Sequence, residues 1–119
     1  MNNSNTVQGP QIYAEGDRLL DLLMQLMPNI KRLYQYNIGS ELLTMAVRLN
    51  LKMRQANSAR GKDKLPFIDD ILNYHGMIEL LLRKMHDSGI ISSKMHAQFI
   101  LVLTSIGKQA NGWRNHYSA

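Results

Sequence analysis

Residues 92–113 read SSKMHAQFILVLTSIGKQANGW, and this stretch decides the fold class that the sequence predicts. Its large side chains recur three or four residues apart, the pattern of one apolar stripe along an amphipathic α-helix. The stripe consists of Met95, Phe99, Val102, Ile106, Gln109 and Trp113. A lone helix with such a stripe is not stable in water. We therefore expect the rest of the chain to supply helices that cover it.

Three earlier segments repeat this periodicity, at about residues 13–27, 38–56 and 66–87. Each carries Leu, Ile or Met at helical spacing, with polar and charged side chains at other positions. The second stripe is Ile38, Leu42, Met45, Ala46, Leu49 and Met53, and the third is Ile68, Ile71, Leu72, His75, Ile78, Leu82 and Met85. With the last segment, these stripes predict four helices.

Turn signals separate the four segments. Pro28 interrupts the first helix because proline lacks an amide donor, whereas Pro66 suits the first turn of the third helix. The Asp-Ser-Gly run at 87–89 is a helix-stop signal, and Ser92 or Ser93 suits the N-terminal cap of the last helix. Short connections and the absence of an alternating strand pattern predict an all-α protein, an antiparallel four-helix bundle.

The bundle is expected to occupy residues 13–114. Residues 1–12, MNNSNTVQGPQI, are polar and contain Gly9 and Pro10, so they predict a disordered N-terminal tail. Residues 115–119 are expected to form a frayed C-terminal tail. A chain of 119 residues with 45% hydrophobic content is long enough for one domain with a core of its own.

Composition limits the compartment and the chemistry. There is no cysteine, which excludes disulfides and thiolate metal sites and suits a reducing cytoplasm. No stretch reaches the roughly 18 apolar residues of a membrane span, and the N-terminus lacks the order of a secretory signal. We therefore expect a cytoplasmic protein without a membrane partner.

The whole chain has a net charge of +5, and its basic residues are concentrated in the middle. Residues 42–62 contain no acid, and the basic side chains of this region and just after it are Arg48, Lys52, Arg54, Arg60, Lys62 and Lys64. Cations placed together release counterions when they contact phosphates, so the six predict a patch that binds RNA or DNA. A solvated surface that only keeps the protein soluble is the alternative reading.

Catalytic constellations are not found in the sequence. It has no phosphate-binding glycine loop, no nucleophile elbow and no paired metal-ligand motif, so it predicts no catalytic residue, cofactor or metal. His75 and Glu79 lie one helical turn apart, but His75 falls within an apolar stripe, where a hydrogen-bonded structural histidine is the expectation. Three tyrosines, Tyr34, Tyr36 and Tyr74, are candidates for stacking on exposed bases or for packing.

Three segments resemble one protein family. They are LMQLMPNIKRLYQYNIGSELL, MIELLLRKMHDSGIISSKMHAQF and IGKQANGW. Together they extend over about residues 19–113, nearly the whole expected bundle. The family is the accessory variability determinant proteins of diversity-generating retroelements. It is related to the four-helix bundle proteins encoded by intervening sequences in bacterial 23S ribosomal RNA genes.

The resemblance implies a non-enzymatic four-helix bundle that assembles as a homopentamer and presents a basic surface. It also implies that the protein binds the reverse transcriptase of the same retroelement together with RNA or DNA. In that system, RNA copied with errors at adenines replaces a variable region of a target gene. The polymerase carries the chemistry, and the accessory protein supports it.

The segment IGKQANGW is similar to the family's most recognisable signature, so Gly107, Gly112 and Trp113 are carried over as structural positions. The glycines are expected to allow close helix approach, and Trp113 to close the bundle end or a subunit contact. The chain departs from the family at Asn111, where a second glycine is common, and in PFIDD at 66–70. Two alternatives stay open: a ribosomal intervening-sequence bundle protein without a polymerase partner, and a protein-only helical adaptor.

Overall fold

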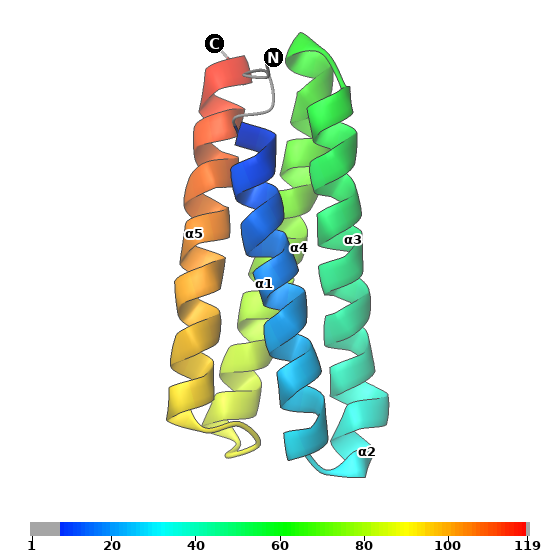
Figure 1. The fold of residues 1–119 in the computed structure, drawn as a ribbon, viewed down its shortest axis with the longest axis vertical. Helices are drawn as coiled ribbons and strands as arrows, with labels where there is room; N and C mark the ends of the chain where they lie inside the picture. Colours follow the sequence, from blue (N-terminus) through cyan, green and yellow to red (C-terminus); the bar gives the residue numbers. More distant parts are fainter. Residues whose placement is uncertain (1–7, 119) are drawn as a thin grey trace.

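The computed structural model describes residues 8–118, and within this span every long element is a helix (Figure 1). The four long helices are α1 (Gln8–Leu26), α3 (Ser40–Ser58), α4 (Leu65–Asp87) and α5 (Ser93–Ser118). Short elements connect them: η2 (Met27–Asn29), α2 (Arg32–Tyr34), η3 (Gln35–Gly39) and η4 (Gly61–Lys64). The expected all-α class with four long helices is confirmed for the described residues.

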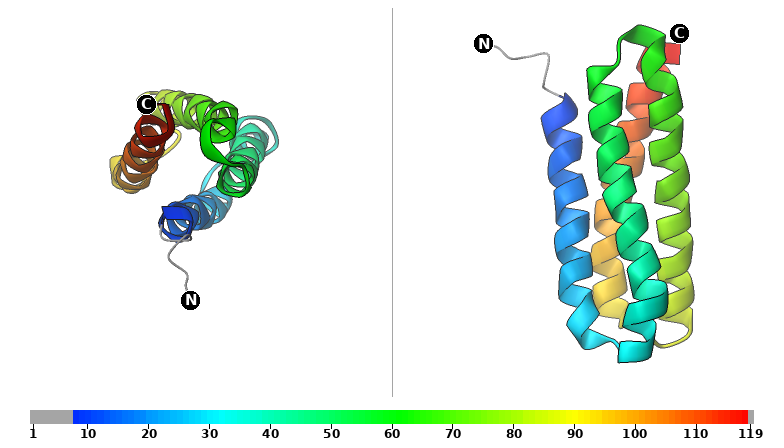
Figure 2. Two further views of the ribbon diagram at one scale, coloured as in Figure 1. Left: turned by 90° about the horizontal axis from the view of Figure 1, so that it is seen from above. Right: turned by 90° about the vertical axis from the view of Figure 1, so that its right-hand side faces the viewer.

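The four long helices pack side by side around one centre. In Figure 1 the chain descends along α1, rises along α3, descends along α4 and rises along α5. Each helix packs against the next one in the chain, and α5 also packs against α1, so the four form a closed ring in the end-on view of Figure 2. The resulting bundle measures 45 × 26 × 21 Å.

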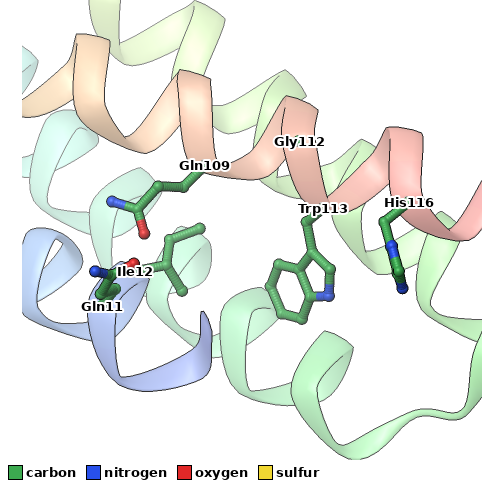
Figure 3. Close-up of a pocket in the computed structure, with 6 residues that line it drawn as sticks. All are labelled: Gln11, Ile12, Gln109, Gly112, Trp113 and His116. Atoms are coloured by element: carbon green, nitrogen blue, oxygen red, sulfur yellow. The ribbon is translucent and has the colours of Figure 1, made fainter. Parts of the chain in front are cut away.

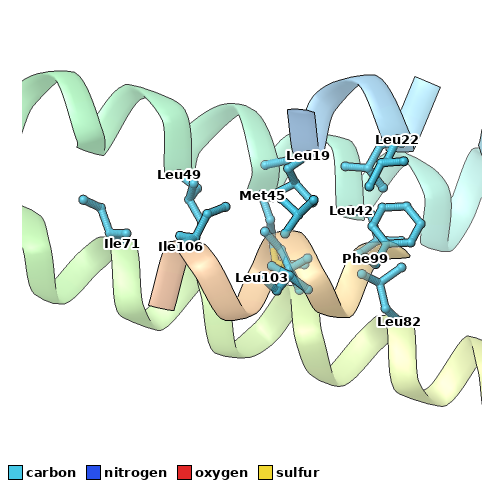
Figure 4. Packing of buried hydrophobic residues seen from close by; sticks show 14 of the residues in the cluster. Leu19, Leu22, Leu42, Met45, Leu49, Ile71, Leu82, Phe99, Leu103 and Ile106 are labelled. Atoms are coloured by element: carbon cyan, nitrogen blue, oxygen red, sulfur yellow. The ribbon is translucent and has the colours of Figure 1, made fainter. Parts of the chain in front are cut away.

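The core is formed by the apolar stripes of all four helices (Figure 4). Leu19 of α1, Leu49 of α3 and Ile71 of α4 meet the stripe of α5, in which Phe99 and Ile106 are completely buried. Burying a side chain of this size contributes about 1.5–3 kcal/mol. The stripe predicted for the last helix is confirmed from Phe99 to Trp113, although Met95 and Gln109 are only half-buried.

The helix ends follow the sequence signals. Pro66 lies in the first turn of α4, where its missing amide proton costs nothing. Gly89 has a φ of +77°, and the amide of Ile90 donates to the Met85 carbonyl at 2.8 Å, which closes α4 in a Schellman motif. At the start of α5, the Ser92 hydroxyl accepts the Met95 amide proton at 3.1 Å. The predicted stop and cap are both confirmed.

The N-terminal boundary differs from the prediction. Helix α1 begins at Gln8, within the tail predicted for residues 1–12, while residues 1–7 lie outside the described part of the chain. Pro10 is tolerated because the first amides of a helix have no intrahelical acceptor, and Ile12 is only 1% exposed. At the other end, α5 continues to Ser118, beyond the predicted limit at residue 114.

Candidate nucleic-acid interface

Arg48 and Lys52 lie one turn apart on the side of α3 that faces α4. Arg48 is exposed, whereas Lys52 is half-buried. The Lys52 ammonium lies 3.3 Å from a carboxylate oxygen of Asp70 and 5.7 Å from the centre of the Phe67 ring, both on α4. The charge of Lys52 is therefore shared with a carboxylate, and Arg48 is the stronger candidate for a phosphate contact.

Arg54 lies on the opposite flank of α3, towards α1. Its Nη1 donates to the carbonyl of Asn50 at 3.2 Å, and its guanidinium carbon lies 4.5 Å from the centre of the Tyr13 ring on α1. Because an α-helix turns about 100° per residue, Arg48 and Arg54 project about 120° apart. The basic side chains of α3 consequently border its outer face on both sides.

Apolar side chains occupy the outer face between these two flanks. Val47 and Leu51 are about half exposed, at 52% and 51%. The six basic residues therefore do not form the uninterrupted positive surface that the sequence suggested. Arg48 and Arg54 flank an apolar strip, an arrangement that suits a ligand with both charged and flat apolar parts, as a single-stranded nucleic acid has.

An open hollow of about 440 Å³ lies beside Arg54, where α3 ends and α4 begins. Its lining includes Ser58 at the end of α3 and the Phe67 ring, and it also contains Gln55. The side-chain oxygen of Gln55 is buried and has no hydrogen-bond partner among residues 8–118. An aromatic ring, a free acceptor and neighbouring cations are the groups that contact an unpaired base and its phosphate.

Arg60 and Lys62 are exposed on the connection between α3 and α4. Gly61 between them has a φ of +53°, a conformation that favours glycine, and it is the first residue of η4. Both cations thus lie at the end of the bundle where α3 ends, and Arg54 lies on α3 four residues before that end. The structure brings these three residues together at one end, and Arg48 lies further along α3.

Lys64, also predicted to bind nucleic acid, is buried and lies apart from this exposed set. Only 9% of the residue is exposed, and its ammonium donates to the carbonyl oxygens of Ala56 and Asn57 at 2.9 and 3.3 Å. A third acceptor is the carbonyl of Ala59. Burial lowers the pKa of Lys64 from its ordinary value. Lys64 therefore caps the C-terminus of α3, where unpaired carbonyls attract a cation.

Of the signature positions, Gly107 lies at a close helix contact. A Cβ atom at Gly107 would be 3.1 Å from Nε2 of His75 on α4. That nitrogen donates to the carbonyl oxygen of Leu103 at 2.6 Å. His75 is therefore a hydrogen-bonded structural histidine, as its position in the stripe predicted, and Gly107 leaves room for its ring.

Gly112 and Trp113 lie at the upper end of the bundle. A Cβ atom at Gly112 would meet nothing within 4 Å, so this glycine is not required for helix approach within one chain. Trp113 is 4% exposed, and its ring lies 5.9 Å from the Lys64 ammonium. Figure 3 shows Gly112 and Trp113 beside a pocket between α1 and α5, which Gln11 and His116 also line. The volume of this pocket is about 300 Å³. Trp113 thus closes this end of the core.

Two features are absent from the described part of the chain. Over residues 8–118, no group of three or more His, Cys, Asp or Glu side chains has an arrangement that could hold a metal ion. Within that part of the chain, no helix combines the length and the apolar character needed to cross a bilayer.

Sequence reasoning missed a second group of basic residues, Lys31 and Arg32, at the opposite end of the bundle. Both are exposed in the connection between α1 and α3, next to the exposed Tyr36. The signal that could have identified them is the run KRLYQY at 31–36, in which two adjacent cations precede two tyrosines.

The sequence matches no protein-family model and no curated protein.

Proposed function

We propose that this protein is a non-enzymatic accessory factor of a diversity-generating retroelement. In this proposal it binds the reverse transcriptase of the element together with RNA or cDNA, and it supports mutagenic retrohoming. It acts in the cytoplasm as an antiparallel four-helix bundle assembled into a homopentamer. The polymerase partner and the pentamer rest on the sequence resemblance carried by the segments described above.

The observation that carries the nucleic-acid part of the proposal is the arrangement around the end of α3. Arg54, Arg60 and Lys62 are exposed at that end, and Arg48 is exposed on the flank of the same helix. The hollow beside Arg54, with Phe67 in its lining, adds a surface for an unpaired base. Four cations that each neutralise one phosphate would give single-strand binding a log–log salt slope of about −3.

A charge-reversal pair tests this interface. The double variant Arg48→Glu/Arg54→Glu is expected to weaken RNA binding at least about tenfold at low salt and to make the salt slope shallower. Lys52 stays unchanged because its reversal would place two carboxylates together at Asp70. The matched control, Arg18→Glu/Lys108→Glu, alters the net charge by the same amount on the exposed surfaces of α1 and α5.

Fluorescence anisotropy with labelled RNA gives the affinities, and circular dichroism verifies that both double variants keep their helicity. Equal affinity of the two double variants would mean that binding depends on net charge alone. The assignment of the nucleic-acid interface to α3 would then be refuted.

The polymerase partner is tested by a pull-down against the reverse transcriptase encoded beside this protein, with and without nuclease, at two salt concentrations. The proposal expects a complex that survives nuclease treatment. A folded bundle that captures no polymerase would contradict it and would favour a ribosomal intervening-sequence bundle protein or an adaptor. The mass in solution, measured by light scattering, is expected to be that of five chains.

A further inference from the structure

The connection between α1 and α3 exposes an aromatic and basic surface at the end of the bundle opposite the α3 C-terminus (Figure 1). Tyr36 is 70% exposed and Leu33 is 67% exposed. Lys31 and Arg32 are exposed beside them, and the Arg32 guanidinium carbon lies 5.9 Å from the centre of the Tyr36 ring. A cation next to an exposed aromatic ring is the pairing by which proteins hold a base and its phosphate.

The connection is held in shape by hydrogen bonds. The side-chain amide of Gln35 donates to the carbonyls of Met27 and Ile30, at 2.7 and 3.0 Å, and so ties the turn to the end of α1. A Cβ atom at Gly39 would lie 2.8 Å from the Met27 sulfur, so the chain passes close to that side chain. A surface fixed in this way loses little entropy when a ligand binds.

A pocket of about 320 Å³ opens next to Lys31. One wall comes from the α1–α3 connection and includes Ile30 and the half-buried Tyr34, and the other comes from the α4–α5 turn and includes Ser88 and Ile90. Figure 1 shows the two connections at the same end of the bundle. The volume exceeds that of a nucleobase, and Lys31 is placed at the pocket to meet a phosphate.

Charge favours an anionic ligand at this end. Lys31 and Arg32 carry two positive charges, and the exposed Lys94 lies in the first turn of α5, directly after the α4–α5 turn. The carboxylates nearest in the chain are Glu41 and Asp87, and Asp87 lies 3.5 Å from Nδ1 of His86. The cations outnumber the carboxylates, so a polyanion is attracted to this end.

We infer that this end of the bundle is a second nucleic-acid site, selective for single strands, in which Tyr36 stacks on an unpaired base and the pocket beside Lys31 takes a neighbouring nucleotide. The inference rests on the proposed binding of nucleic acid and adds its substrate class. Selectivity follows because the bases of a duplex are already stacked and paired, which leaves no face for Tyr36. The two sites lie at opposite ends of a bundle 45 Å long, so one strand can be held at both.

Stacking is tested with the variant Tyr36→Ala and its matched control Tyr36→Phe, which keeps the ring. Tyr36→Ala is expected to weaken binding of a short labelled oligouridine about tenfold, with duplex RNA of the same length bound as by the unaltered protein. Tyr36→Phe is expected to bind both as the unaltered protein does. Because Tyr36 is exposed, circular dichroism is expected to show the same helicity for all three proteins.

The pocket is tested with Ser88→Phe, which places a ring where the neighbouring nucleotide would lie. This variant is expected to weaken oligouridine binding and to spare duplex binding. Cross-linking with an oligonucleotide that contains 5-iodouridine gives an independent readout. The adduct is expected on Tyr36, within the tryptic peptide of residues 33–48.

The inference is overturned if Tyr36→Ala binds oligouridine with unchanged affinity, or if adducts form only on peptides around residues 54–62. If Arg48→Glu/Arg54→Glu loses binding at the same time, the proposed function stands and only the second site fails. If the unaltered protein binds neither RNA, both fail. A Tyr36→Ala protein that keeps its RNA affinity but loses the reverse transcriptase in the pull-down would assign this end to a protein partner.

Discussion

Removing the ammonium of Lys64 tests the most unexpected contact in the bundle. The variant Lys64→Met keeps the length and apolar stem of the side chain but has no donor for the three carbonyls at the end of α3. Two of these hydrogen bonds are 2.9 and 3.3 Å long, and the ammonium also lies 5.3 Å from the centre of the Tyr117 ring. The substitution therefore leaves a helix terminus without its cap.

The expected loss of stability is about 2 kcal/mol. A hydrogen bond to a charged group contributes about 1.5–3 kcal/mol, and a cation at a helix C-terminus adds about 0.3–1 kcal/mol. The desolvation of the ammonium, which lowers the pKa of Lys64, offsets part of this sum. Between the lowered pKa of Lys64 in the folded protein and the ordinary pKa of a lysine, the unfolded chain binds more protons than the folded protein. The free energy of unfolding is therefore expected to rise with pH across this interval.

Thermal unfolding followed by circular dichroism measures the effect. For a domain of this size, about 2 kcal/mol corresponds to a Tm lower by about 8 °C. The matched control is Lys62→Met, the same substitution at an exposed position two residues earlier, which is expected to change stability by less than about 0.5 kcal/mol. Equal Tm values for the two variants would refute the capping role of Lys64.

Two further predictions concern a glycine pair and a histidine pair. Gly107→Ala is expected to lower the free energy of unfolding by about 1–3 kcal/mol because its Cβ would lie 3.1 Å from His75. Gly112→Ala, in open space on the same helix, is expected to raise the free energy of unfolding by up to about 1 kcal/mol. Equal shifts of the urea unfolding midpoint in the two variants would contradict this. Burial and the stacked His86 ring, 4.5 Å away, lower the pKa of His96. Tm should therefore fall as pH drops below about 6.5, and less so in His96→Gln.

The sequence predicted most of the fold because the decisive signals are local. The stripe through Phe99 and Ile106 requires only helical spacing, and Pro66 and Gly89 act on the backbone of their own turn. Helix α1 begins before residue 13, where the sequence predicted its start, because Ile12 is buried against the other helices. The polar residues around Ile12 do not reveal this burial. Tertiary packing overrode the local composition there.

The candidate site was less predictable because exposure is a property of the assembled bundle. Lys62 and Lys64 have the same chemistry and lie two residues apart, yet one is exposed and the other caps a helix. Arg48 and Arg54 share a helix, but Arg54 lies against Tyr13 of α1. The pairing of Lys52 with Asp70 likewise depends on how α4 packs against α3.

The sequence by itself determined that the chain forms four long helices with apolar stripes and where their turns lie, since periodicity, proline and glycine act within a few residues. Only the tertiary structure decided which cations remain available to a ligand and where pockets open. Each of those properties requires two segments distant in the chain to meet, as the α1–α3 connection and the α4–α5 turn do beside Lys31.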